Sequence, residues 1–272
     1  MYTILSERAL VRISGEDRLK FLQGLISNDV NKLKADNSLY ACMLTPQGKY
    51  FADFFLKLDQ DCILMDLPAA RKDEILKKLK LYKLRSAVIF TECPEYKILS
   101  FLNISINKGL VFADPRSNKL GLRGFIHESE FEEVTHGLEL SQNAYDLARI
   151  DNFVAEGEKD LIPEQSFPLE YGLEELNAFD YKKGCYVGQE LIARTHYLGV
   201  IRKQIVQVTS AQVLPVLGTL IYAGEQKLGL ICSSIANKGL ALIRTENVTS
   251  LSPEAKITAG SQEIKLKFKE NI

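Results

Sequence analysis

A single aspartate interrupts an otherwise apolar and aromatic segment. Residues 50–56 read YFADFFL, and Asp53 is the only charged residue in them. If the segment is a strand, Asp53 shares a face with Phe51 and Phe55, because alternate side chains point the same way. A carboxylate among rings must meet water, a donor or a ligand, since burying it unpaired costs free energy. Two interpretations stay open: a solvent-exposed strand face, or a carboxylate that accepts hydrogen bonds from a flat heterocycle held between aromatic rings.

A thiol between two glycines is the second candidate for chemistry. Residues 183–190 read KGCYVGQE, and a short helix is expected to begin near Gln189. Lys183 and a nearby helix N-terminus would both favour the thiolate form of Cys185, which is the nucleophilic and metal-binding form. A free cysteine can equally be a small buried apolar residue. A catalytic Cys–His pair would require His196 to fold back onto Cys185, and no recognisable Asn or Asp pattern orients that histidine.

A basic segment offers a third possibility. Residues 71–85 contain seven Lys or Arg against two acids, a net charge of +5. Such a run is typical of the solvated face of an amphipathic helix. The alternative is a surface for RNA or another polyanion, but Tyr82 is the only aromatic residue available to stack on bases. Neither a Gly-x-Gly-x-x-Gly nor a Walker-type phosphate loop occurs. We therefore do not expect a nucleic-acid partner.

Composition narrows the functional classes further. The 272 residues carry 34 basic and 35 acidic side chains, so no global charge draws the chain to nucleic acid or an anionic membrane. The five cysteines lie far apart, and the three histidines lack helical metal-ligand spacing. We expect no protein-built metal site, no transmembrane segment and no secretory signal. These features predict a soluble, cytoplasmic protein.

The elements that must position these residues mix strands and helices. The hydrophobic pattern predicts strands over 7–13, 38–44, 50–58, 62–66, 96–102 and 109–113. It predicts helices over 16–26, 67–79, 128–138 and 142–153, the second of them capped by Asp66 with Pro68 in its first turn. Thr45-Pro46-Gln47-Gly48 suits a type I turn, so the strand that carries Asp53 is expected in a hairpin. From residue 200 onward, short apolar strands divided by glycines indicate a small β-barrel or sandwich.

Several motifs resemble those of one known family. The segment 183–190 matches the K-G-C-Y-x-G-Q-E signature of the YgfZ family, folate-binding proteins related to the aminomethyltransferase (T-protein) of the glycine cleavage system. Residues 15–30, 44–49, Leu84-Arg85, Arg149 and 162–164 resemble further blocks of that family. The resemblance spans the chain from about residue 8 to the β-rich tail. It is closest to the branch that matures iron–sulfur clusters.

The resemblance implies an α+β fold, a three-domain cloverleaf around a central folate-binding cavity, with a small C-terminal β-barrel. The corresponding domains would be 1–95, an α+β lobe carrying the Asp53 hairpin; 96–197, a central α+β lobe ending in the KGCYVGQE motif; and 198–272, the barrel. The lobes are expected to interleave, because T-protein-like chains weave segments between them.

The same resemblance assigns roles to individual residues. Aligned with the T-protein hairpin, Asp53 falls on the key folate-site aspartate, and Tyr40 on a tyrosine that lines the pocket. Tetrahydrofolate or a derivative is the implied cofactor, with these residues as its binding site: Tyr40, Asp53, Lys183, Gln189, Glu190 and Arg194. The residues with catalytic roles would be Cys185, Asp53 and Lys183. Two departures weaken the match: Ser27 replaces the family's Thr, and Asp151 lies in a loose version of an arginine–acid–glycine block.

Three functions follow, in order of preference. The first is a tetrahydrofolate-binding accessory protein that supports iron–sulfur cluster assembly or repair in client enzymes, including tRNA-modifying ones. Its partners would be folate and, transiently, iron–sulfur client or assembly proteins, and Cys185 could contact a cluster, a persulfide or a partner. The second is a folate-dependent one-carbon (aminomethyl or methyl) transferase in which Asp53 binds or deprotonates and Cys185 is structural. The third is an RNA-binding module that uses the basic segment.

Overall fold

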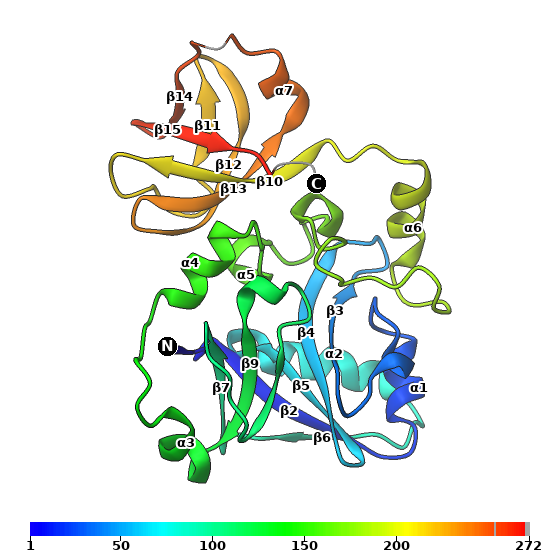
Figure 1. The fold of residues 1–272 in the computed structure, drawn as a ribbon. Coiled ribbons are helices and arrows are strands. Elements are labelled where there is room, and N and C mark those ends of the chain that lie inside the picture. Colours follow the sequence, from blue (N-terminus) through cyan, green and yellow to red (C-terminus); the bar gives the residue numbers. More distant parts are fainter. Residues whose placement is uncertain (253, 270–272) are drawn as a thin grey trace.

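Three sheets organise the computed structural model, which describes residues 1–252 and 254–269. The first sheet has five strands in the order β3-β4-β5-β2-β6, and the second has four in the order β1-β7-β9-β8. The third is a closed barrel in the order β10-β13-β12-β11-β14-β15. In Figure 1 the barrel lies above the two open sheets, with α4 and α5 between them. This is the mixed fold with a C-terminal β-barrel that the sequence predicts.

The strands of the two open sheets are β1 (Tyr2–Ile4), β2 (Arg8–Ser14), β3 (Ser38–Leu44), β4 (Tyr50–Asp59), β5 (Cys62–Pro68), β6 (Ile89–Glu92), β7 (Tyr96–Phe101), β8 (Leu110–Ala113) and β9 (Leu122–His127). The barrel strands are β10 (Lys203–Ser210), β11 (Leu220–Ala223), β12 (Gln226–Ile235), β13 (Lys238–Arg244), β14 (Ile257–Ala259) and β15 (Gln262–Lys267). The helices are α1 (Arg18–Gln23), α2 (Lys72–Lys83), α3 (Glu128–Thr135), α4 (Ala144–Asp151), α5 (Gly157–Asp160), α6 (Gln189–Leu198) and α7 (Thr245–Thr249).

The β3–β4 hairpin forms where the sequence predicts it. The amide of Gly48 donates to the carbonyl of Thr45 at 2.9 Å, and Gly48 has φ +72°, a conformation that glycine adopts without steric cost. The first eight residues of β4 are buried. Phe54 and Leu56 pack into the core beneath α1 and α2, whereas Tyr50 and Phe55 belong to the core between the lobes. Because both faces of β4 are covered, the solvent-exposed interpretation of Asp53 is wrong.

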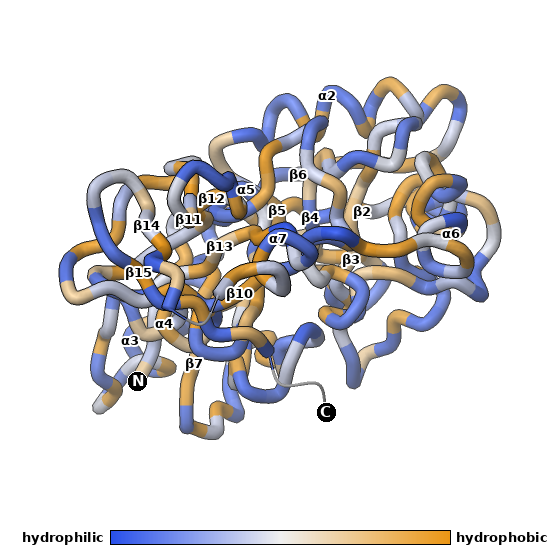
Figure 2. The backbone as a smooth tube through the Cα atoms, turned by 90° about the horizontal axis from the view of Figure 1, so that it is seen from above, coloured by the Kyte–Doolittle hydropathy of each residue, from blue (hydrophilic) through white to orange (hydrophobic). Residues whose placement is uncertain are grey.

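The helix predicted over 67–79 begins later than expected. Leu67 and Pro68 continue β5, and α2 starts only at Lys72 after a short 3-10 turn. Asp66 is therefore a buried strand residue and not a helix cap. Leu67 is fully buried in the core of the first sheet, and this packing favours the strand over an early helix start. Within α2, Ile75, Leu76 and Leu79 are buried, and Figure 2 shows hydrophilic and hydrophobic residues alternating along this helix.

The first strand of the chain belongs to the second sheet. β1 pairs antiparallel with β7, so that Tyr2 faces Phe101 and Ile4 faces Leu99. The β1, β6 and β9 strands have no counterpart among the predicted elements. No helix in the described ranges is both long and apolar enough to cross a bilayer.

Candidate functional site

Asp53 is fully buried at the centre of the molecule, where three side chains of this chain donate to its carboxylate. Arg8 Nη1 donates to Oδ1 at 3.0 Å, and the Tyr50 hydroxyl donates to the same oxygen at 3.1 Å. The Tyr40 hydroxyl donates to Oδ2 at 3.1 Å. The structure thus brings Tyr40 and Asp53 together, as the resemblance implies. The donors that satisfy Asp53 belong to the protein.

Asp66 connects the first two sheets. Its Oδ1 accepts from Arg8 Nε at 2.6 Å, and its Oδ2 accepts from Arg123 Nε at 2.7 Å. Arg8 lies on β2 and Arg123 on β9, so one carboxylate on β5 binds a guanidinium from each sheet. Burial alone would lower the pKa of Arg8, but the charges of Asp53 and Asp66 outweigh it and raise that pKa. Arg8 therefore stays charged in the interior.

Glu156 receives the third buried guanidinium. Arg116 Nη1 donates to its Oε2 at 2.7 Å, and the hydroxyl of Tyr145 donates to the same oxygen. Asp114 accepts from Arg116 Nη2 at 2.7 Å. Burial acts to raise the pKa of Glu156, but Arg116 and Lys159 outweigh it and hold that pKa well below its usual range. The Glu156 carboxylate is therefore ionised although it is buried.

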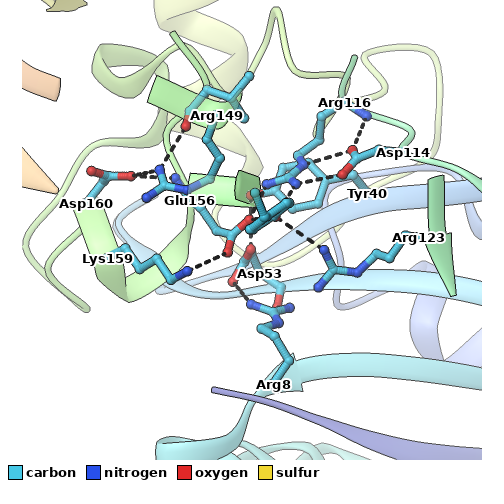
Figure 3. Close-up of polar contacts among 12 residues, drawn as sticks. Arg8, Tyr40, Asp53, Asp114, Arg116, Arg123, Arg149, Glu156, Lys159 and Asp160 are labelled. Carbon is cyan, nitrogen blue, oxygen red and sulfur yellow. Dashed lines mark hydrogen bonds and ion pairs between the residues drawn. The ribbon is translucent and has the colours of Figure 1, made fainter. Parts of the chain in front are cut away.

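A further ion pair extends the cluster to the barrel. Arg149 Nη1 donates to Asp160 Oδ2 at 2.8 Å, and Arg149 Nη2 donates to the hydroxyl of Ser233 on β12 at 3.0 Å. The amide of Ser233 donates to Asp160 Oδ1 at 2.8 Å. Figure 3 shows Arg149, Asp160 and Glu156 close to Asp53 and Arg8, which lie far from them in the sequence. We call the whole set the ionic junction: Arg8, Asp53, Asp66, Asp114, Arg116, Arg123, Tyr145, Arg149, Glu156, Lys159 and Asp160.

Only part of this junction carries a signal in the sequence. Asp53 was conspicuous because it interrupts an apolar run, and Arg149 because it matches a family block. Arg8, Arg116 and Arg123 carried no comparable signal. Arg8 begins β2, Arg116 follows β8, and Arg123 lies near the start of β9, all places where an exposed arginine is common. A possible signal was the density of charge around 156–160, EGEKD, directly after the buried residues Val154 and Ala155.

Cys185 is exposed in the loop that precedes α6, whereas Cys42, Cys62, Cys93 and Cys232 are buried. The expected helix start at Gln189 is confirmed. Lys183 is buried, and its ammonium group donates to the carbonyls of Ile26 at 2.5 Å and Asn28 at 2.8 Å. Burial lowers the pKa of Lys183 to about 8. Lys183 therefore anchors the base of the Cys185 loop to the segment between α1 and β3.

His196 contacts an aromatic ring and a carboxylate near the Cys185 loop. Its ring stacks on Tyr181 with 3.7 Å between ring centroids, and Nδ1 lies 2.5 Å from Glu174 Oε1. The partners of His196, which lies on α6, are therefore Tyr181 and Glu174. These contacts give no support to a catalytic pair of His196 with Cys185. Gln189, Glu190 and Arg194 lie on α6 beyond the loop; Glu190 and Arg194 are exposed.

The residues in the centre do not fit a tetrahydrofolate molecule. Asp53 is inaccessible, and both of its oxygens already accept hydrogen bonds. The cavity beside it, lined by Arg8, Glu156, Gly157 and Lys159 among others, has a volume of about 200 Å³. Pockets for drug-sized ligands are larger, about 300–1,000 Å³. The described residues also contain no group of three or more side chains arranged as metal ligands.

Comparison with known proteins places the chain in a family. Residues 202–270 match the family model of the CAF17 C-terminal β-barrel domain. The human mitochondrial iron–sulfur cluster assembly factor IBA57 is 30% identical, in an alignment that covers 90% of this chain and 77% of the human protein. This chain belongs to the IBA57 family. A Mycosarcoma maydis relative, also named a mitochondrial iron–sulfur cluster assembly factor, is 37% identical over 74% of this chain.

Solved structures confirm the fold of this IBA57-family chain. The glycine cleavage system aminomethyltransferase T from Bartonella henselae superposes with a TM-score of 0.68 over 97% of this chain and 83% of that chain. At 13% sequence identity, this likeness concerns the fold alone. The T-protein-like fold is thereby confirmed. The YgfZ resemblance is refined, because the relatives named above are IBA57 proteins.

The names and lengths of the relatives bear on the location of this chain and on how much of their function it can share. A cytoplasmic location is wrong on this comparison, because the human, mouse and Mycosarcoma relatives are named mitochondrial. The chain spans 55% of the Mycosarcoma relative and 52% of the Neurospora crassa relative. What those whole proteins do therefore comes to this chain only as a proposal.

Proposed function

We propose that this chain is an accessory factor in iron–sulfur cluster assembly, with Cys185 as the thiol that contacts a cluster or a cluster-carrying partner. Its family membership supports the role, since the relatives are named iron–sulfur cluster assembly factors. The observation that carries the assignment to Cys185 is its exposure in an anchored loop, while the other four cysteines are buried. The chain would act in mitochondria, the compartment in the relatives' names.

A single thiol defines what this site can do chemically. Iron–sulfur clusters are commonly held by four cysteine thiolates. Cys185 supplies one ligand, so the remaining ligands would come from a partner protein, and contact would be transient. The cluster is then cargo passed between proteins. We include tRNA-modifying iron–sulfur enzymes among the clients, as the sequence resemblance implies.

Complementation tests this proposal. The chain, directed to mitochondria, is expressed in cells that lack their own IBA57-family gene, and the activity of a [4Fe–4S] enzyme is compared with that of an iron-free enzyme. The wild type restores the [4Fe–4S] activity, and Cys185→Ser does not. Lys182→Ala, an exposed neighbour in the same loop, serves as the matched control and restores activity. Full restoration by Cys185→Ser at equal protein level would contradict the role of the thiol.

The one-carbon transferase and RNA-binding alternatives stay predictions with their own readouts. A transferase would form methylene-tetrahydrofolate from a methylated amine and tetrahydrofolate. An RNA-binding module would show affinity that falls steeply with salt and depends on the basic face of α2. In the structure Arg71 of that segment donates to Glu74 and Glu158, so part of its charge is already paired.

A further inference from the structure

The ionic junction fills the space where the sequence resemblance places a folate. Three guanidinium groups surround the ring of Phe55: Arg123 lies 3.8 Å, Arg116 4.6 Å and Arg8 5.4 Å from its centroid. Tyr40 packs on the same ring with 4.9 Å between centroids. An aromatic ring buried among cations and another ring has no free face. A pteridine could not stack on Phe55 unless arginines left their partners.

Backbone as well as side chains closes the site around Asp53. The first residue of α5 is Gly157, and a Cβ added there would lie 2.7 Å from Asp53 Oδ1 and 3.3 Å from the Tyr50 hydroxyl oxygen. The main chain of α5 therefore rests directly on the carboxylate. A hydrogen-bonding heterocycle needs that position for itself. Access would require α5 to move away from β4.

Every cation of the junction already has a carboxylate partner. Its four guanidinium groups belong to Arg8, Arg116, Arg123 and Arg149, and its five carboxylates to Asp53, Asp66, Asp114, Glu156 and Asp160. Lys159 lies 2.6 Å from Glu7 Oε1, 2.9 Å from Asp146 Oδ1 and 3.7 Å from Glu156 Oε1. Arg149 Nε also pairs with Asp146 Oδ1 at 2.8 Å, so the carboxylates outnumber the cations and no cation of the junction is free. A folate brings carboxylates of its own, and an additional buried anion without a free cation is strongly disfavoured.

The junction also performs a structural task that a central ligand could perform. Arg8 and Asp66 come from the first sheet, Arg123 from the second, and the Arg149–Asp160 pair binds Ser233 of the barrel. Arg123 Nη1 donates to the Tyr145 hydroxyl at 3.3 Å, that hydroxyl donates to Glu156, and the amide of Glu156 donates to Asp160 Oδ2 at 2.8 Å. A continuous network of ion pairs and hydrogen bonds therefore joins all three sheets. We infer that this chain holds its lobes together with its own arginines and carboxylates, and that its centre takes no folate. This inference is independent of the role proposed for Cys185.

Direct titration tests the inference. Tetrahydrofolate and 5-formyltetrahydrofolate are titrated anaerobically into the full chain by calorimetry, and thermal unfolding is followed with and without each compound. We expect no saturable heat and an unchanged Tm. A ligand at about 100 times its Kd would raise the Tm of a chain of this size by about 5 °C or more. A folate-binding enzyme run in parallel confirms that the compounds are intact.

Two variants locate any binding that is seen. Tyr40→Phe removes one donor to Asp53 while keeping the ring, and Asp53→Asn removes the charge. Saturable binding by the wild type that Tyr40→Phe or Asp53→Asn weakens at least tenfold would overturn the inference. Binding that is equal in the wild type, Tyr40→Phe and Asp53→Asn would place folate elsewhere on the chain and leave the inference standing. Cys185→Ala serves as a control outside the junction.

Discussion

The α-carbon of Gly157 faces Asp53 so closely that a methyl group added to it would lie 2.7 Å from Oδ1. This contact lies where α5 begins, and it fixes how closely the segment between the lobes approaches β4. The close packing around Asp53 therefore depends on the absence of a side chain at Gly157 as well as on the charged side chains.

Gly157→Ala should destabilise the protein by about 1–3 kcal/mol, because the methyl group meets Asp53 and Gly157 has φ +35°. The matched control is Gly137→Ala, which shares a positive φ of +74° but has nothing within 4 Å of the added group. Urea unfolding of both variants measures the difference. Equal losses would show that backbone strain alone accounts for the effect.

Asp66→Asn should cost about 3 kcal/mol of unfolding free energy, because it leaves Arg8 and Arg123 buried without their shared counter-charge. Asp59→Asn is the control, since the Arg12–Asp59 pair is 3.8 Å apart and partly exposed. Pairs of that kind contribute about 0–1 kcal/mol. Denaturant midpoints compare the two, and similar values for both would contradict a structural role for the junction.

Stability should depend on pH through Glu156. Its pKa lies well below that of an unfolded glutamate, about 4.3, so between the two values the unfolded chain binds more protons than the folded one. The stabilisation is therefore fully present above about pH 5 and is lost as the pH falls through the folded pKa. Tm measured from pH 7 to pH 3 should fall less steeply at the acid end in Glu156→Gln than in the wild type. Parallel curves would exclude Glu156 as a source of the acid sensitivity.

Iodoacetamide should modify one cysteine in the native protein and all five after denaturation. Cys185 is exposed, and the other four thiols lie in the core. Intact-mass spectrometry gives the number of adducts, and peptide mapping gives their position. Cys185→Ser should take up no label under native conditions. Rapid native labelling of Cys232, which lies within the barrel region and is fully buried, would contradict the packing described here.

The sequence predicted those elements whose signals are local. The β3–β4 hairpin follows from its turn residues and from strand alternation, and α1 and α4 follow from helical spacing. Asp53 could be singled out because a charge inside an apolar strand needs a partner. The exposure of Cys185 was not predictable from the motif, which suits a buried thiol equally well.

The ionic junction depends on contacts between residues far apart in the chain. Arg8 meets Asp53 and Asp66, and Arg123 meets Asp66, although nothing in their immediate surroundings indicates a partner. The sequence Asp66-Leu67-Pro68 favours a helix start with Asp66 as its cap. In the structure the pairing of Asp66 with two guanidinium groups outweighs that local preference.

The pairing of β1 with β7 affects the order in which the chain can fold during synthesis. Tyr2 faces Phe101, so β1 gains its partner only after about a hundred further residues have been synthesised. At roughly 5–20 residues per second this takes at least several seconds. The five-stranded sheet can assemble earlier, as soon as β6 ends at Glu92. The first sheet can therefore form while β1 still lacks its partner β7. During that time the edge of β1 is unpaired, and a chaperone could cover it.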